Sequence, residues 1–335
     1  MSSKRFLLFL TVIFTIPAVY SYADNLKPEA EVGHVFIYKV KKTFEIKPGV
    51  AMNSMQFKFP LIKKELQNQK MFDLAVDPNY NALVTDPDGN EIAIFYFSSV
   101  PAGKTVVVFM GYTIKIEKMG IVIDPAKVSA DYSKDIDEVK GYLGNEGGVD
   151  VNNESIRNSS HSIVQKEENP YLKGKAIYDF IARNIEYENV EDVSGWQAPN
   201  ETLSKARGNC NAITKLFIAL ARASGLPARE VAGVVFTPNV SEKKCIADAG
   251  HAWAEIYLPG YGWLPVDATF GITEIEKYYC FSNTTHIKEV YGQMVSRNPG
   301  SLYRGSSIEG RTYSNVGNIP FENKAKIEID LASEY

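Results

Sequence analysis

Three residues whose side chains act together in acyl transfer lie in the second half of the chain: Cys210, His251 and Asp267. A thiolate can attack the carbonyl carbon of an amide, and an imidazole can take up a proton and later give it to the leaving group. A carboxylate can hold the second nitrogen of that imidazole. If the three side chains meet in the fold, they form a thiol-dependent catalytic site.

Cys210 lies at the predicted start of an amphipathic helix. Apolar residues follow it at the spacing of a buried helix face: Ile213, Leu216, Phe217 and Leu220. At a helix N-terminus, unpaired N–H groups and the positive end of the dipole favour the thiolate over the thiol. The backbone N–H of Cys210 would also donate to the oxyanion formed by attack. Because Cys210 precedes the apolar stripe, we interpret it as a nucleophile rather than a buried structural cysteine.

His251 and Asp267 lie at the ends of two predicted strands that form a hairpin around a turn at 259–262. A four-residue turn would leave the two side chains on opposite faces, because successive side chains of a strand alternate. A three-residue loop or a bulge brings them to one face. Pro265, which cannot donate a hydrogen bond to a neighbouring strand, favours such an irregularity.

The whole chain predicts a fold of the α+β class with two domains. Residues 24–124 contain runs of β-branched and aromatic residues separated by turn residues, which is typical of a β-sandwich. Residues 125–169 are rich in polar residues and glycine and predict a linker with a short helix near 155–164. Helical stripes and a hairpin predict a mixed α and β domain over 170–335, with a closing strand near 326–331.

Residues 1–23 predict a signal peptide. Lys4 and Arg5 precede an apolar run from 6 to 20, and small residues follow the run. The run is short for a membrane span, so an uncleaved anchor is the less favoured alternative. No later segment is apolar and long enough to cross a membrane. We therefore expect a secreted, periplasmic or cell-envelope protein with no integral membrane span after signal removal.

The composition argues against a nucleic-acid partner and against a metal centre. The net charge is −4, and no basic run with interleaved aromatic residues occurs. With four His, three Cys and no close pair of either type, the chain offers too few ligands for a closed zinc site. We expect no metal and no cofactor. The expected substrate is a protein or peptide, with substrates in the cell envelope included.

The cysteine count predicts one disulfide. An odd number of cysteines in an exported protein suggests one bridge and one free thiol. Cys245 and Cys280 lie in loop-like surroundings and are the candidate pair, which would leave Cys210 free. The alternative is three unpaired cysteines, because two loops of the sequence need not meet in space.

Together, these segments resemble the transglutaminase-like superfamily, whose fold is related to that of papain. The similar segments comprise an upstream entry segment, the nucleophile helix with the turn after it, and the histidine and aspartate strands. They are, in chain order, 185–187, 208–210, 216–229, 250–257 and 262–269, and the core motif covers 202–271. The resemblance implies a transglutaminase-like, papain-like core within 170–335, after an N-terminal β-domain.

The resemblance also implies roles for individual residues. Cys210 would be the nucleophile, His251 the base and Asp267 the residue that orients the imidazole. In the family, a second oxyanion donor comes from an upstream side chain. Here Tyr187 and Trp196 are both candidates, and the sequence does not choose between them.

The implied activity is that of an exported, thiol-dependent amide hydrolase or acyltransferase. Transglutaminases carry a Trp directly after the nucleophile, whereas this chain has Asn211, which favours protease-type hydrolysis over cross-linking. The alternative is a non-catalytic binding or assembly module of the cell envelope, in which the β-domain recognises the partner. A metal-dependent hydrolase is a third interpretation and would require bound zinc.

Overall fold

The computed structural model describes residues 33–146, 148–188, 197–239, 244–247, 250–282, 284–291, 307–311 and 321–335. The predicted signal peptide and Trp196 lie outside these residues. Among the described helices, none has the length and apolar character needed to cross a membrane.

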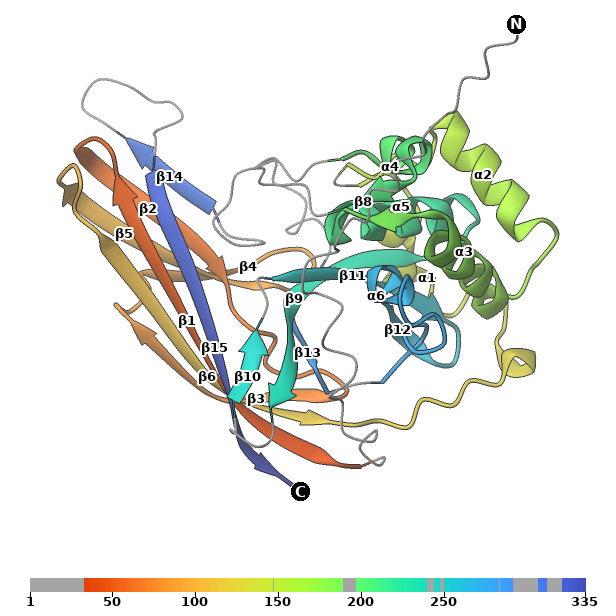
Figure 1. Ribbon diagram of the computed structural model, residues 1–335, viewed down its shortest axis with the longest axis horizontal. Helices are drawn as coiled ribbons and strands as arrows, with labels where there is room; N and C mark the ends of the chain where they lie inside the picture. Colours follow the sequence, from red (N-terminus) through yellow and green to blue (C-terminus); the bar gives the residue numbers. More distant parts are fainter. Residues whose placement is uncertain are drawn as a thin grey trace, which may run out of the picture. The chain divides into compact units, whose positions relative to one another are not determined.

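The N-terminal part of the chain is all-β, as predicted. Its six strands are β1 (Val35–Pro48), β2 (Met52–Pro60), β3 (Gln69–Asp77), β4 (Ala82–Thr85), β5 (Glu91–Val100) and β6 (Val106–Glu117) (Figure 1). Every second residue of β1 is buried, which is the pattern of a strand with one face on a core. Phe44 of β1 and Phe59 of β2 stack with ring centroids 4.3 Å apart, although the two strands belong to different sheets. Side chains such as these pack the two sheets against each other.

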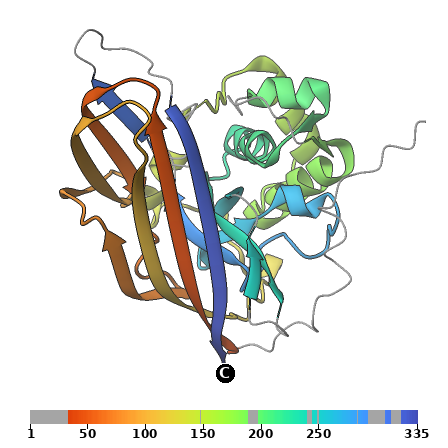
Figure 2. The same ribbon diagram turned by 60° about the vertical axis from the view of Figure 1, so that its left-hand side comes forward.

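Strands from the far end of the chain complete both sheets. β14 (Ser307–Arg311) pairs with β2, and β15 (Phe321–Glu334) lies along β1 over almost its whole length (Figure 2). The strand predicted near 326–331 is therefore confirmed, and it is longer than expected. The larger sheet runs in the order β12 (Gly262–Val266), β11 (His251–Leu258), β9 (Ala228–Asn239), β10 (Lys244–Ala247), β15, β1, β6 and β3. In this sheet β13 (His286–Tyr291) is attached to β9, and the smaller sheet runs in the order β14-β2-β5-β4. The division at 24–124, 125–169 and 170–335 stays a prediction, but the sheets combine strands from the first and last of these segments.

The segment between the β-region and the core is mostly short helices. It contains η2 (Pro125–Lys127), α1 (Ile136–Val139), η3 (Lys140–Tyr142) and α2 (Glu154–Val164). The helix α2 lies where a short helix was predicted. Asn153 caps it by accepting hydrogen bonds from two N–H groups of its first turn.

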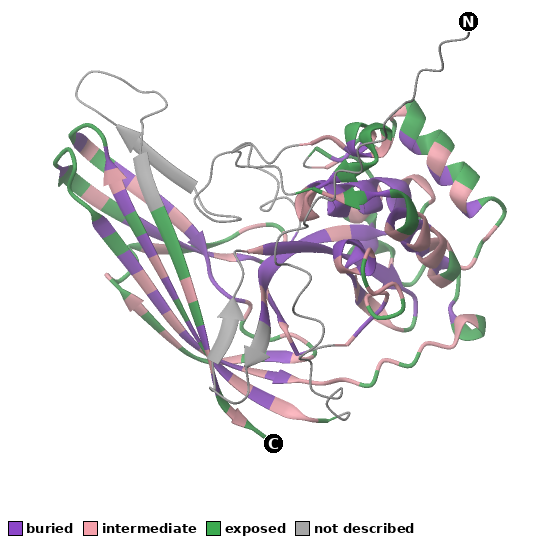
Figure 3. Cartoon of the chain, in the orientation of Figure 1, coloured by how far each residue is buried: buried purple, intermediate pink, exposed green. Residues whose placement is uncertain are grey.

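The remaining elements form an α+β core. They are α3 (Pro170–Asn184), β7 (Glu186–Tyr187), α4 (Pro199–Lys205), β8 (Arg207–Gly208), α5 (Cys210–Ala223), β9 (Ala228–Asn239), β10 (Lys244–Ala247), β11 (His251–Leu258), β12 (Gly262–Val266), α6 (Ala268–Gly271) and β13 (His286–Tyr291). Helix α5 packs against β11 and is buried over most of its length (Figure 3). The apolar stripe that predicted this helix therefore faces the core.

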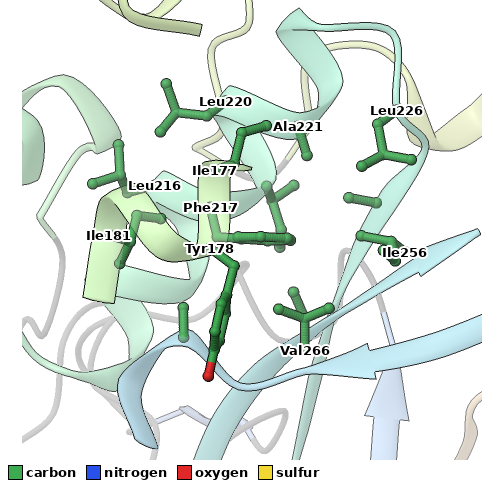
Figure 4. Close-up of a cluster of buried hydrophobic side chains, with 14 of the residues drawn as sticks. Ile177, Tyr178, Ile181, Leu216, Phe217, Leu220, Ala221, Leu226, Ile256 and Val266 are labelled. Carbon is green, nitrogen blue, oxygen red and sulfur yellow. The ribbon is translucent and has the colours of Figure 1, made fainter. Parts of the chain in front are cut away.

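Apolar side chains of α3 and α5 pack onto the hairpin of β11 and β12. Ile177 and Ile181 come from α3, Phe217 comes from α5, and Ile256 and Val266 come from the two strands (Figure 4). Each of these side chains is fully buried. Thr214 of α5 also donates a hydrogen bond of 3.1 Å to the carbonyl of Ala252 on β11. This packing fixes the N-terminus of α5 relative to the strand that begins at His251.

Candidate active site

Cys210 is the first residue of α5, as its sequence context predicted. Asn209 is the N-cap, and its side chain accepts a hydrogen bond from the N–H of Ala212 at 3.1 Å. The preceding Gly208 permits a close approach of the chain, because a Cβ there would lie 2.9 Å from that of Ala212 and 3.2 Å from Thr202. Cys210 is partly exposed, so its sulfur lies at the positive end of a buried helix and within reach of a substrate.

A short parallel pair of strands places Tyr187 beside the nucleophile segment. In the register of β7 and β8, Tyr187 lies opposite Gly208, and the N–H of Glu188 donates to the Gly208 carbonyl at 3.0 Å. Gln197, which the sequence did not single out, donates to the carbonyl of Arg207 at 2.7 Å. Tyr187 therefore stays a candidate oxyanion donor, whereas the other candidate, Trp196, lies outside the described residues.

The hairpin of β11 and β12 brings the side chains of His251 and Asp267 to one face of the sheet. Leu258 pairs with Gly262, so the loop has three residues, and one of the two arrangements foreseen from the sequence is confirmed. Gly260 and Gly262 adopt φ values of +84° and +77°, which suit glycine and close the tight loop. As a result, Nε2 of His251 lies 2.7 Å from Oδ2 of Asp267.

Asp267 is held by hydrogen bonds to both of its carboxylate oxygens. It is the N-cap of α6, where Oδ1 accepts from the N–H groups of Thr269 and Phe270, each at 3.0 Å. Oδ2 is then directed at the imidazole of His251. Burial raises the pKa of Asp267, but the charge and hydrogen bond of His251 outweigh burial and hold the pKa well below its usual range. The carboxylate is therefore ionised at neutral pH.

His251 is a cation held between a carboxylate and a thiol. Burial lowers its pKa, but the charge and hydrogen bond of Asp267, together with the side-chain hydrogen bond and charge of Cys210, raise the pKa to about 10. Because Nε2 faces Asp267, the other ring nitrogen, Nδ1, is the one left for the sulfur of Cys210. A protonated imidazole in this position stabilises a thiolate, which is the nucleophilic form of cysteine.

A second histidine, which the sequence reasoning missed, also contacts Asp267. Nε2 of His286, the first residue of β13, lies 3.2 Å from the same Oδ2. Burial lowers the pKa of His286, although the hydrogen bond to Asp267 opposes this shift. Four aromatic rings surround the buried imidazole, those of Trp253, Phe270, Tyr278 and Phe281. The β-branched and aromatic residues of 286–291 indicate a strand, but no local pattern shows that it pairs with β9.

The two histidines and Asp267 form a set of metal-ligand types that the sequence analysis did not anticipate. One donor atom from each lies within 4.8 Å of the others, and all three residues are buried. The distances of 2.7 and 3.2 Å fit hydrogen bonds from protonated imidazole nitrogens to the carboxylate. A metal would require both imidazole nitrogens to give up these protons.

The predicted disulfide between Cys245 and Cys280 is not formed. Cys280 is an unbridged thiol, buried in the hydrophobic core around α3 and β12. The backbone of Cys245 lies on β10, where it pairs with Ile329 of β15. The two loop-like segments thus belong to different parts of the fold. Burial raises the pKa of the Cys280 thiol far above its usual range, so this cysteine is not a second nucleophile.

Part of the chain is similar to known proteins. Residues 157–268 match the family model of the transglutaminase-like superfamily. An uncharacterized protein of Haemophilus influenzae is 30% identical over 130 residues, which are 34% of this chain and 35% of that protein. The uncharacterized protein YebA of Bacillus subtilis is 25% identical over 132 residues, which are 36% of this chain and 18% of YebA. The chain thus covers about a third or less of either relative.

The similarity of fold extends over most of the chain. A crystal structure from Cytophaga hutchinsonii, provisionally described as a cysteine protease, superposes with a TM-score of 0.65 at 19% identity. The superposition covers 89% of this chain and 91% of that one. At this identity the likeness concerns the fold alone. It includes the N-terminal β-region as well as the α+β core.

Proposed function

We propose, from the premise that residues 157–268 form a domain of the transglutaminase-like superfamily, that the protein is a thiol-dependent amide hydrolase or acyltransferase. Cys210 is the nucleophile, His251 is the acid and base, and Asp267 orients His251. One observation carries this proposal: a buried Asp267 binds His251 at 2.7 Å, and His251 contacts a cysteine at the start of α5. A buried structural cysteine would need neither partner.

The chemistry follows from the protonation state of the pair. The thiolate of Cys210 forms a bond to the carbonyl carbon of an amide, and the electron pair of the C=O bond moves to oxygen. The N–H of Cys210 donates to that oxyanion, because the first N–H groups of a helix have no intrahelical partner. When the oxyanion collapses, the C–N bond breaks, and the imidazolium of His251 protonates the leaving amine. An acyl-enzyme thioester and a neutral imidazole remain.

The acceptor of the acyl group determines the final product. Neutral His251 takes a proton from water or from an amine, which then attacks the thioester and releases Cys210. Water gives cleavage or deamidation, and an amine gives a cross-link. The residue after the nucleophile is Asn211 rather than the Trp of transglutaminases, which supports hydrolysis as the main outcome. The substrate is a protein or peptide met outside the cytoplasm, in keeping with the predicted signal peptide.

The reactivity of Cys210 tests the proposal directly. Alkylation by iodoacetamide at neutral pH is followed by mass spectrometry of the Cys210 peptide in the wild type and in His251→Ala. We expect Cys210 to react at least about tenfold faster than glutathione, and His251→Ala to remove this advantage. A wild-type rate equal to that of glutathione, with no change in His251→Ala, would overturn the catalytic function.

Peptide libraries then identify the reaction. They are incubated with the wild type and with Cys210→Ala, and the products are analysed by mass spectrometry. Chain cleavage, a mass gain of about one unit from deamidation, and a cross-linked mass are distinct results. Products formed equally by Cys210→Ala would contradict a thiol mechanism.

A further inference from the structure

Two imidazoles converge on a single carboxylate oxygen. Oδ2 of Asp267 lies 2.7 Å from Nε2 of His251 and 3.2 Å from Nε2 of His286. The side chain of Asp267 is 0% exposed and that of His286 is 5% exposed, so water does not replace either contact. His251 is charged and faces the thiol, whereas His286 is surrounded by aromatic rings and keeps a lowered pKa. A neutral His286 can still donate one N–H, and Oδ2 is its hydrogen-bond acceptor.

The strand that carries His286 is fixed on one side by β9. His286 pairs with Val235, and Lys288 pairs with Gly233. Gly233 also pairs with His251 on the other neighbouring strand, β11. A Cβ at Gly233 would lie 1.9 Å from the carbonyl oxygen of Ile287, so only glycine allows β13 to approach this closely. This close approach brings both histidines to the same carboxylate.

The N-terminal β-region fixes the same strand from its other side. The side-chain amide of Gln69 donates to the Lys288 carbonyl and accepts from the Lys288 N–H, each at 2.9 Å. Asn90 makes the same reciprocal pair with Tyr291, at 3.0 and 2.9 Å. Between these two clamps, Glu289 forms an ion pair with Lys42 of β1, in which both side chains are 1% exposed.

We propose that His286 is a positioning residue for Asp267, and that the β-region sets its place through β13. The Nε2–H of His286 donates to Oδ2 and, with the two N–H groups on Oδ1, prevents the carboxylate from rotating away from His251. This inference rests on the proposed function, because it assigns His286 a role in the same site. The β-region is thus part of the catalytic architecture in addition to being a scaffold.

A pair of variants separates hydrogen bonding from packing at His286. His286→Phe keeps an aromatic ring among the four others but removes the donor. His286→Gln loses the ring but keeps an N–H at the place of Nε2. We expect alkylation of Cys210 to slow about tenfold or more in His286→Phe, because the loss of one hydrogen bond to a charged group corresponds to a rate change of this size. In His286→Gln the rate should stay within about threefold of the wild type. A packing role gives the opposite order, and that order would overturn the proposal.

His286→Met serves if His286→Phe does not fold, because Met matches Gln in shape and lacks the donor. The wild type supplies a measurement that needs no variant. In ¹⁵N–¹H correlation spectra of the imidazole groups, His286 is expected to be neutral with its proton on Nε2. A proton on Nδ1 alone contradicts the donor assignment. Slow labelling of wild-type Cys210 would instead count against the proposed function, so the two failures are distinguishable.

The role of the β-region is tested at its clamps. Asn90→Ala removes both hydrogen bonds to Tyr291, and we expect it to slow alkylation about threefold or more without unfolding the protein. Lys64→Ala is the matched control, because Lys64 forms an exposed ion pair with Glu91 in the same region, and its side chain makes no hydrogen bond or ion pair with β13 among the described residues. Equal rates for Asn90→Ala, Lys64→Ala and the wild type would show that the clamps do not act on the site.

Discussion

Two buried carboxylates on one face of the same sheet each bind two basic side chains, but the basic side chains differ. Asp267 binds His251 and His286. Glu255 follows His251 by four residues on β11, so both side chains point to the same face. Glu255 accepts from the guanidinium of Arg229 at 2.9 and 2.7 Å and from the ammonium of Lys288 at 2.6 Å. Both carboxylates are 0% exposed.

The difference lies in whether the partners can exchange protons near neutral pH. Burial raises the pKa of Glu255, but Lys288 and Arg229 outweigh it and lower the pKa to about 2. The rings of Trp263 and Tyr291 lie 4.1 and 3.9 Å from the guanidinium, which holds Arg229 in place. This cluster is permanently charged and locks three strands together. An imidazole can both lose and gain a proton, so the Asp267 cluster can do chemistry.

Glu255→Gln should give the largest effect on stability. The change leaves two largely buried cations without a counter-charge, and breaking a buried ion pair in this way costs about 3–5 kcal/mol. Urea denaturation at pH 7 measures the loss in the free energy of unfolding. The alkylation rate of the folded fraction should stay within about twofold of the wild type. A large change in that rate would show that the two clusters are not separate in function.

Asp267→Asn should give the opposite result. Asn keeps an oxygen for the N–H groups of Thr269 and Phe270, so α6 retains its cap. The charge that raises the pKa of His251 is lost, and we expect alkylation of Cys210 at pH 7 to fall about a hundredfold. The loss in unfolding free energy should be smaller than that of Glu255→Gln. A rate close to that of the wild type would remove Asp267 from the mechanism.

The two clusters should differ in how they stabilise the fold at alkaline pH, because only the Asp267 cluster contains an imidazole. The pKa of Glu255 is lowered to about 2 from 4.5, so its contribution is complete above pH 4.5 and is lost as the pH falls toward 2. The pKa of His251 is raised to about 10 from 6.5, so its contribution is complete below pH 6.5 and is lost as the pH rises toward 10. Urea denaturation from pH 2 to 10 measures the loss of unfolding free energy toward acid pH (the acid limb) and toward alkaline pH (the alkaline limb).

Single variants show which residues cause the acid limb and the alkaline limb. Glu255→Gln should flatten part of the acid limb and leave the alkaline limb unchanged. His251→Gln should flatten the alkaline limb and also part of the acid limb, because His251 holds the pKa of Asp267 down. If Glu255→Gln also flattened the alkaline limb, the clusters would be coupled, and the comparison between the two carboxylates would fail.

The sequence predicted those parts of the site that depend on local pattern. The apolar stripe after Cys210 is contained within one helix, and α5 forms where it indicates. The hairpin depends on a three-residue loop that contains Gly260 and is followed by Gly262, and its register could be narrowed to two alternatives. Local geometry of this kind is encoded by residues close in sequence.

The remaining features depend on pairings between distant segments. His286 approaches Asp267 only because β13 pairs with β9, where His286 lies opposite Val235. Likewise, β15 joins β1 from the far end of the chain, and Cys280 lies in the core rather than next to Cys245. Neither the hydrophobic periodicity nor the residue spacing of a single sequence predicts such long-range contacts.

Lys288→Met should give the smallest effect on stability and is the closest counterpart of a change at His286. The change removes the second partner of Glu255, as His286→Met removes the second partner of Asp267. Arg229 still binds Glu255 with two N–H groups, so we expect the free energy of unfolding to fall by about 1–2 kcal/mol in urea denaturation. The alkylation rate should not change, although Lys288 lies on the same strand as His286. Slower alkylation in Lys288→Met would mean that the position of the whole strand β13 affects the site. The hydrogen bond from His286 would then no longer explain the difference between the two carboxylates.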